Sequence, residues 1–197
     1  MVCPYFYSPN FFAIKSGGNY EHRAFIFDID GFNRELKPLL ESCLRSGSID
    51  QVRDFIVSNR QSLVDPYEGF ALEDGWEDMI ESKDVHQYGD FALTKYYSPT
   101  DDRGLGLWWS ISQELFSDKS KLSFLPFLGA PLGSGSNFFD PGKMGSYFQA
   151  QHEVRESLSK VLEVEVKVPD DALEAVREFK KMLEQAIDEK KGVYITF

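Results

Sequence analysis

The sequence has little cysteine, little histidine and no long hydrophobic run. Its two cysteines, Cys3 and Cys43, are too few for a disulfide framework and lack metal-ligand spacing, which favours a reducing compartment. The three histidines form no HExxH sequence and no cluster with cysteine, which argues against a transition-metal enzyme. No window is long and apolar enough for a membrane helix, and residues 1–10 have no signal-peptide pattern. We therefore expect a cytoplasmic protein that needs no cofactor and no membrane.

Positive charge is also scarce. Lys and Arg number 21 against 32 Asp and Glu, which gives a formal net charge of −11. Binding to nucleic acid phosphates or to anionic membranes requires cations placed against a negative surface, so this balance argues against both. It leaves two interpretations open: the excess acid keeps the protein soluble, or it attracts a basic partner.

Apolar and aromatic residues are abundant. They make up 42% and 15% of the chain, with 17 Phe, which is enough for a sizeable core. A length of 197 residues without a visible linker or internal repeat predicts one globular domain spanning residues 1–197. Residues 117–145, rich in Gly, Pro and Phe, read as a long irregular segment, and a segment of that length suggests a functional or mobile part. An aromatic groove beneath it is one possibility.

The first half of the chain predicts a strand followed by a helical hairpin. Residues 24–29 (AFIFDI) form a short apolar run of strand formers. Residues 30–46 have apolar residues at helical spacing, although Pro38 requires the helix to start near Glu35 or to kink there. Gly47 suits the end of that helix, and Ser48 with Gln51 forms a capping box that opens the next one.

The second half predicts strands alternating with helices. Residues 91–97 and, more clearly, residues 162–168 (LEVEVKV) have the composition or alternation of strands. A helix beginning near Asp171 then leads into a terminal strand at residues 193–197. This order predicts an α+β domain with a mixed or mostly antiparallel sheet, helices covering one face, and a C-terminal strand–helix–strand unit.

The most unusual stretch is the acidic segment, residues 65–90. It contains nine carboxylates and one cation, Lys83, a formal net of −8 out of the chain's −11. Trp76 and other apolar residues run through it, so it is patterned to fold against a core and is not an acidic tail. Asp74 to Glu77 forms a second capping box, and acidic residues in a first helical turn also suit the helix dipole.

A second feature is the sequence FDIDGF at residues 27–32, at the end of the first strand. It resembles the first motif of haloacid-dehalogenase-type phosphatases. By that resemblance Asp28 would be the nucleophile and Asp30 the acid/base. This chemistry needs Mg²⁺ held by further acidic residues on a parallel sheet, and Phe32 stands where the motif has Thr or Val. A helix cap at Asp30 is the alternative interpretation.

Several scattered features resemble the bacterial YfbM-like family of unknown function. They are Trp76 after the helical hairpin, LGAPLG at residues 128–133, Tyr147, Glu153-Val154 leading into a helix, and a long helix running into a terminal strand. The family's His-Phe pair after the tryptophan is replaced here by Glu77-Asp78-Met79, and residues 88–124 look like an insertion. The resemblance implies a fold and no reaction.

Our leading hypothesis is a non-catalytic binding protein that presents the acidic segment around an indole to a basic protein partner, as an immunity or inhibitor protein does. The alternative is a Mg²⁺-dependent phosphohydrolase that uses Asp28 and Asp30. The residues predicted for the binding surface are Glu73, Asp74, Trp76, Glu77, Asp78, Glu81 and Asp84.

Overall fold

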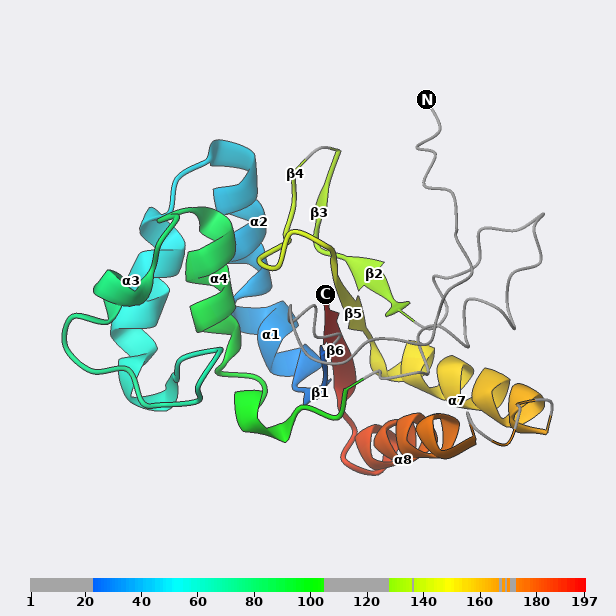
Figure 1. The fold of residues 1–197 in the computed structure, drawn as a ribbon. Helices are drawn as coiled ribbons and strands as arrows, with labels where there is room; N and C mark the ends of the chain where they lie inside the picture. The colour runs from blue at the N-terminus through cyan, green and yellow to red at the C-terminus, as the bar shows by residue number, and fades with distance from the viewer. Residues whose placement is uncertain (1–22, 105–127, 136, 167, 169, 171–172) are drawn as a thin grey trace, which may run out of the picture.

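A four-stranded antiparallel sheet lies at the centre of the protein (Figure 1). The computed structural model describes residues 23–104, 128–135, 137–166, 168, 170 and 173–197. The strands are ordered β1 (Arg23–Phe27), β6 (Gly192–Thr196), β5 (Ser146–Gln149) and β2 (Ala130–Pro131). The hairpin β3 (Gly133–Ser134) and β4 (Asn137–Phe138) forms a separate small sheet. The α+β fold class and the antiparallel sheet are therefore confirmed.

The two faces of the sheet bury different sets of side chains. On β1 and β6, Phe25, Phe27 and Tyr194 belong to a core shared with the N-terminal helices. Ala24, Val193 and Ile195 alternate with them and belong to a second core shared with the C-terminal helices. Helices consequently cover both faces, as Figure 1 shows, and the expectation of a single covered face was wrong. Period-two alternation of two apolar sets is what a strand buried on both sides requires.

The first three helices follow in part from local signals in the sequence, although the capping box expected at Ser48 and Gln51 was wrong, because Ile49 precedes the third helix without a side-chain cap. These are α1 (Ile29–Glu35), α2 (Lys37–Ser46) and α3 (Asp50–Asn59). The helix is interrupted between α1 and α2 at buried Leu36. This interruption places Pro38 in the first turn of α2, where a missing N–H is tolerated. Gly47 ends α2 in the left-handed conformation at φ 74°, and its N–H donates to the Cys43 carbonyl at 2.8 Å. The helical hairpin of α2 and α3 is confirmed.

A long connection leads from α3 to α4 (Val85–Leu93). It contains two short 3₁₀ helices, η1 (Arg60–Ser62) and η2 (Trp76–Met79), and a third, η3 (Pro99–Asp101), follows α4. The strand expected at residues 91–97 was wrong, because residues up to Leu93 belong to α4. The Asp84 carboxylate caps α4 by accepting hydrogen bonds from the N–H groups of His86 and Gln87, both at 3.0 Å. A short apolar run fits a buried helix as well as a strand, and this cap selects the helix.

The strand expected at residues 162–168 was also wrong. Helix α7 (Gln151–Glu165) runs through most of that range, and α8 (Leu173–Asp188) lies beside it in Figure 1. Val154, Ser157 and Val161 are fully buried along one side of α7 at helical spacing. The Glu165 carboxylate accepts a hydrogen bond from Lys180 Nζ of α8 at 2.9 Å, which ties the end of α7 to its neighbour. Packing against α8 therefore overrides the alternation of apolar and charged residues.

Part of the predicted irregular segment lies within the described residues and part does not. Residues 128–135 and 137–145 contain β2, β3 and β4, whereas residues 117–127 and 136 lie outside the description, as do Cys3 and Asp171, where a helix cap was expected. Among the described helices, none has both the length and the apolar character needed to cross a membrane.

Candidate functional site

Trp76, placed at the centre of the predicted binding surface, lies mainly in the core. Its exposed fraction is 6%, and its ring makes an edge-to-face contact with Tyr88 at 5.7 Å between centroids. Phe91 lies 6.1 Å away on the next turn of α4. The predicted place of Trp76 in the binding surface is thus corrected, whereas the expectation that the segment folds against a core is confirmed: Trp76 anchors the acidic segment to α4.

Three of the predicted carboxylates have partners in the fold. Asp74 forms an ion pair with Arg60, and Glu77 forms one with Arg53 at 2.5 Å. Asp84 caps α4. The predicted capping box is absent from η2, where Gly75 precedes the 3₁₀ helix without a side-chain cap. Arginines of α3 and η1 therefore neutralise part of the acidic segment.

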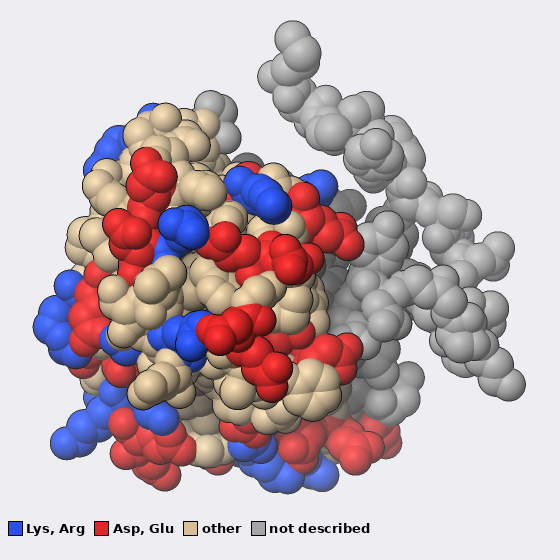
Figure 2. Space-filling view, turned by 90° about the vertical axis from the view of Figure 1, so that its left-hand side faces the viewer, with Lys and Arg blue, Asp and Glu red and all other residues tan. Residues whose placement is uncertain are grey.

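The other three predicted carboxylates, Glu73, Asp78 and Glu81, are exposed. Within the described part of the chain, no hydrogen bond or ion pair engages their side chains. We call these three residues the acidic face. Figure 2 looks onto this side of the molecule, where acidic and basic side chains are interspersed. This surface therefore carries charges of both signs, with an excess of carboxylates at the acidic face, and is not uniformly negative.

Large apolar side chains are exposed in the same part of the chain. The exposed fractions are 71% for Phe70, 59% for Tyr67 and 46% for Met79, and Val57 of α3 is exposed by 57%. Phe70 and Tyr67 lie on the turn closed by the hydrogen bond from the Asp65 N–H to the Phe70 carbonyl at 2.8 Å. Exposed aromatic and Met side chains among charged residues are typical of protein interfaces.

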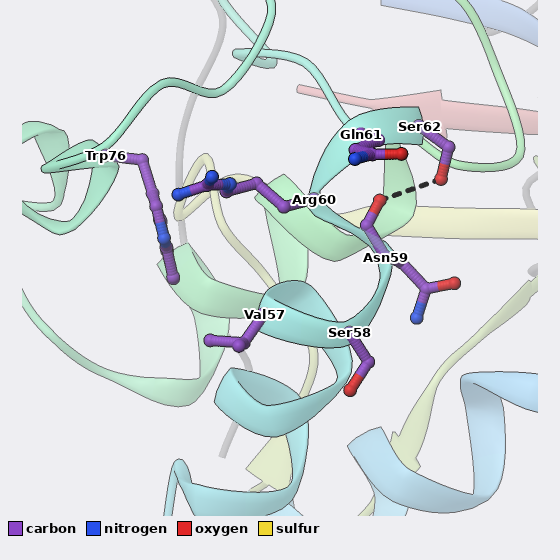
Figure 3. A pocket seen from close by; sticks show the side chains of 7 residues that line it. All are labelled: Val57, Ser58, Asn59, Arg60, Gln61, Ser62 and Trp76. Atoms are coloured by element: carbon purple, nitrogen blue, oxygen red, sulfur yellow. Dashed lines mark hydrogen bonds between the residues drawn. The ribbon is translucent and has the colours of Figure 1, made fainter.

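A shallow hollow of about 700 Å³ lies beside the acidic segment (Figure 3). It is lined by the end of α3 and η1, from Val57 to Ser62, and by Trp76. Arg60 extends across it toward the indole in Figure 3, and the same guanidinium pairs with Asp74. The lining is made of neutral polar side chains, Arg60, Val57 and the indole.

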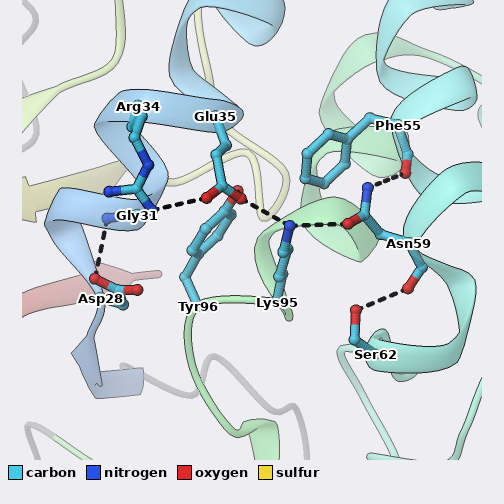
Figure 4. A network of polar contacts seen from close by, with 9 residues as sticks. All are labelled: Asp28, Gly31, Arg34, Glu35, Phe55, Asn59, Ser62, Lys95 and Tyr96. Carbon is cyan, nitrogen blue, oxygen red and sulfur yellow. Dashed lines mark hydrogen bonds and ion pairs between the residues drawn. The ribbon is translucent and has the colours of Figure 1, made fainter.

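The two carboxylates of the phosphatase alternative serve different elements. The Asp28 carboxylate caps α1 by accepting a hydrogen bond from the Gly31 N–H at 3.0 Å (Figure 4). Asp30 lies inside α1 and accepts one from Gln151 Nε2 of α7 at 3.1 Å. Their strand, β1, pairs antiparallel with β6, whereas the motif needs a parallel sheet. Among the described residues, no three His, Cys, Asp or Glu side chains are grouped to hold a metal ion.

A polar network behind α1 ties three segments together (Figure 4). Lys95 Nζ donates to Glu35 Oε2 at 2.7 Å and to Asn59 Oδ1 at 2.8 Å, and Arg34 also donates to Glu35 at 2.8 Å. These hydrogen bonds, that from Lys95 first, lower the pKa of Glu35 to about 2. The Glu35 carboxylate thus holds two cations, Lys95 and Arg34, from two segments, which is the pattern of a structural brace.

Asp90 was not singled out by the sequence patterns as a site residue. It lies in α4 with an exposed fraction of 8%, and burial raises the pKa of its carboxyl to about 7. It lines a second pocket, of about 490 Å³, at the edge of the sheet where β1 begins and β6 ends. The available signal was a single carboxylate inside the apolar run of residues 88–93 (YGDFAL).

No protein-family model matches this chain, and no curated protein or solved structure matches it. The resemblance to the YfbM-like family stays a prediction.

Proposed function

We propose that this protein is a cytoplasmic, non-catalytic binding protein whose acidic face contacts a basic protein partner, as an immunity or inhibitor protein does. The observation that supports this proposal is the coexistence, in one segment, of the acidic face with exposed Phe70 and Met79. Opposite charge speeds and selects encounters, while apolar and aromatic anchors supply most of the affinity.

The salt bridges within the protein also support this proposal. Asp74 and Glu77 hold the acidic segment against Arg60 and Arg53, so the segment is fixed in place by its own salt bridges. Glu73, Asp78 and Glu81 then project from a backbone that Trp76 anchors. A fixed segment loses less conformational entropy on binding than a mobile one, which favours affinity.

The cytoplasmic location rests on cysteine chemistry. Cys43 is buried on α2 with a free thiol. A free thiol is stable in a reducing compartment and is a liability in an oxidising one.

Two variants with the same charge change test the proposal. The first combines Glu73→Gln, Asp78→Asn and Glu81→Gln on the acidic face. The control combines Glu156→Gln, Glu163→Gln and Glu174→Gln, which are exposed residues of α7 and α8. Proteins crosslinked to the wild-type protein in cell extract are identified, and the purified partner is then measured by surface plasmon resonance at two salt concentrations.

We expect a basic partner whose association rate falls about tenfold in the acidic-face variant at low salt and is nearly unchanged in the control. Phe70→Ala should instead raise the dissociation rate. A partner that binds both triple variants equally well, or that is itself acidic, contradicts the proposal.

A further inference from the structure

The pocket that contains Asp90 shares no lining residue with the acidic face. Its walls come from β1 (Arg23), the turn with Tyr67 and Glu68, helix α4 (Asp90), and Tyr97. The turn at residues 141–144 and the end of β6 complete it. A volume of about 490 Å³ is within the range of sites for small molecules. We call this the Asp90 pocket.

The Asp90 carboxylate is buried and has no hydrogen-bond partner among the described residues, although it lines an open pocket. The described chain leaves no fully enclosed side-chain oxygen without a partner. The oxygens of Asp90 must therefore keep contact with the pocket. A carboxylate in such a position can accept hydrogen bonds from a ligand bound in the pocket.

Arg23 is the cation that acts on Asp90, but its guanidinium is bonded to other groups. Nη1 donates to the Pro66 carbonyl and Nη2 to the Pro99 carbonyl, each at 3.1 Å. Nε lies 3.6 Å from Asp102, which balances its charge. Arg23 thus fastens two loops to β1 and makes no ion pair with Asp90.

Aromatic side chains surround the carboxylate. The Tyr97 ring is 9% exposed and is fixed by contacts with Phe25 at 4.4 Å and Tyr194 at 5.4 Å between centroids. Tyr67 stands at the rim with an exposed fraction of 59%, next to the exposed carboxylate of Glu68. Aromatic faces attract cations, and a carboxylate beside them supplies the counter-charge.

We propose that the Asp90 pocket binds a small primary ammonium ion, with the Asp90 carboxylate as its counter-ion and the rings of Tyr67 and Tyr97 around its alkyl chain. An ammonium group supplies the N–H donors that Asp90 lacks. An anion is disfavoured because Asp90 and Glu68 both face the pocket and Arg23 is already balanced.

The pH dependence of ligand binding, set by protonation of the Asp90 carboxyl, gives a second test of this site. Besides Asp90, the charged or titratable groups around it are Arg23, Asp65, Glu68, Tyr67, Tyr97 and Tyr194. Burial raises the pKa of each of the three tyrosines, so they stay neutral near pH 7, and Arg23 stays charged. Burial brings the pKa of the Asp90 carboxyl to about 7, so an ammonium ion should bind more tightly at pH 8 than at pH 6.

The test is calorimetric titration of the full chain with n-butylammonium chloride and, separately, with the neutral probe n-butanol. We expect saturable millimolar binding of n-butylammonium at pH 8, weakened about tenfold at pH 6 and at least tenfold by Asp90→Asn, with no binding of n-butanol. Asp78→Asn on the acidic face is the matched control and should bind like the wild type.

Tyr67→Ala changes an exposed ring and should weaken binding severalfold while the melting temperature stays constant. It keeps the test decisive if Asp90→Asn disturbs folding. The proposal is overturned if n-butanol binds as well as n-butylammonium, if n-butylammonium does not bind, or if a folded Asp90→Asn protein binds it as tightly as the wild type.

Discussion

Lys95 and Glu35 are joined by an ion pair of 2.7 Å that links the turn after α4 to the end of α1. Lys95 also donates to Asn59 of α3, and its Nζ lies 5.1 Å from the centre of the Phe55 ring. Lys95→Met keeps the alkyl stem and removes all the polar contacts. We expect a lower midpoint of urea unfolding, whereas Lys83→Met, an exposed control, should leave the midpoint within experimental error. Equal midpoints for the two variants would contradict a bracing role.

The ion pair between Lys95 and Glu35 also predicts that the folded state loses stability at acidic pH. Glu35 has a pKa of about 2, below its ordinary 4.5, first because of the hydrogen bond from Lys95. A lowered pKa in the folded state contributes stability that is complete above pH 4.5 and is lost as pH falls toward 2. Unfolding midpoints measured between pH 5 and pH 2.5 should therefore fall more for the wild type than for Glu35→Gln. Parallel curves would show that Glu35 does not contribute.

Trp76→Ala distinguishes an anchor from a contact residue. Because the indole is 6% exposed and packs on Tyr88 and Phe91, its removal leaves a cavity and should lower the free energy of unfolding by about 3–5 kcal/mol. Phe70→Ala removes a side chain that is 71% exposed and should change it by less than about 0.5 kcal/mol. Urea denaturation measures both variants. A small change in the free energy of unfolding for Trp76→Ala would contradict the role of a core anchor and favour a role for the indole in binding.

Local signals account for the parts of the fold that the sequence predicted. Strand β1, the break near Pro38 and the left-handed end at Gly47 each depend on residues within a few positions of one another. The errors at residues 91–97 and 162–168 have the opposite origin. There, short apolar or alternating runs fit both a helix and a strand. The Asp84 cap selects the helix in α4, and packing against α8 selects it in α7.

The candidate sites were harder to predict because their partners are distant in sequence. Arg53 and Glu77 are 24 positions apart, and Arg23 and Pro99 are 76 apart, so no local pattern could show these contacts. The same applies to Trp76, whose acidic neighbours suggested a surface position while Tyr88 and Phe91 bury it. Asp90 was identifiable only as a charge inside an apolar run, which does not reveal the pocket it faces.

Asp28→Asn separates the role of a helix cap from that of a nucleophile. Asn caps a helix about as well as Asp, so this variant should retain the wild-type stability, whereas Asp28→Ala should lose about 1 kcal/mol. We expect no turnover of p-nitrophenyl phosphate with Mg²⁺ by the wild type or by either variant. Turnover by the wild type that disappears in Asp28→Asn would instead establish the phosphohydrolase alternative.

Asp90 predicts that stability falls as pH rises toward neutrality. Burial raises the pKa of its carboxyl from 3.8 to about 7, so between these values the folded protein holds a proton that the unfolded chain has released. Stability then declines with rising pH across that window, by up to roughly 4 kcal/mol at about 1.4 kcal/mol per pH unit. Asp90→Asn has no such proton to lose. Urea unfolding should find that the advantage in stability of the variant over the wild type is larger at pH 8 than at pH 5.

The control for this comparison is Asp78→Asn, which removes an exposed carboxylate from the acidic face and should keep the wild-type dependence on pH. A saturating concentration of n-butylammonium at pH 8 should recover part of the lost stability in the wild type, because a ligand that binds only the folded state stabilises it. It should do nothing for Asp90→Asn. If wild type and Asp90→Asn decline in parallel from pH 5 to pH 8, the Asp90 carboxyl is not the buried charge that this pocket requires, and both the pH effect and the ammonium site fail together.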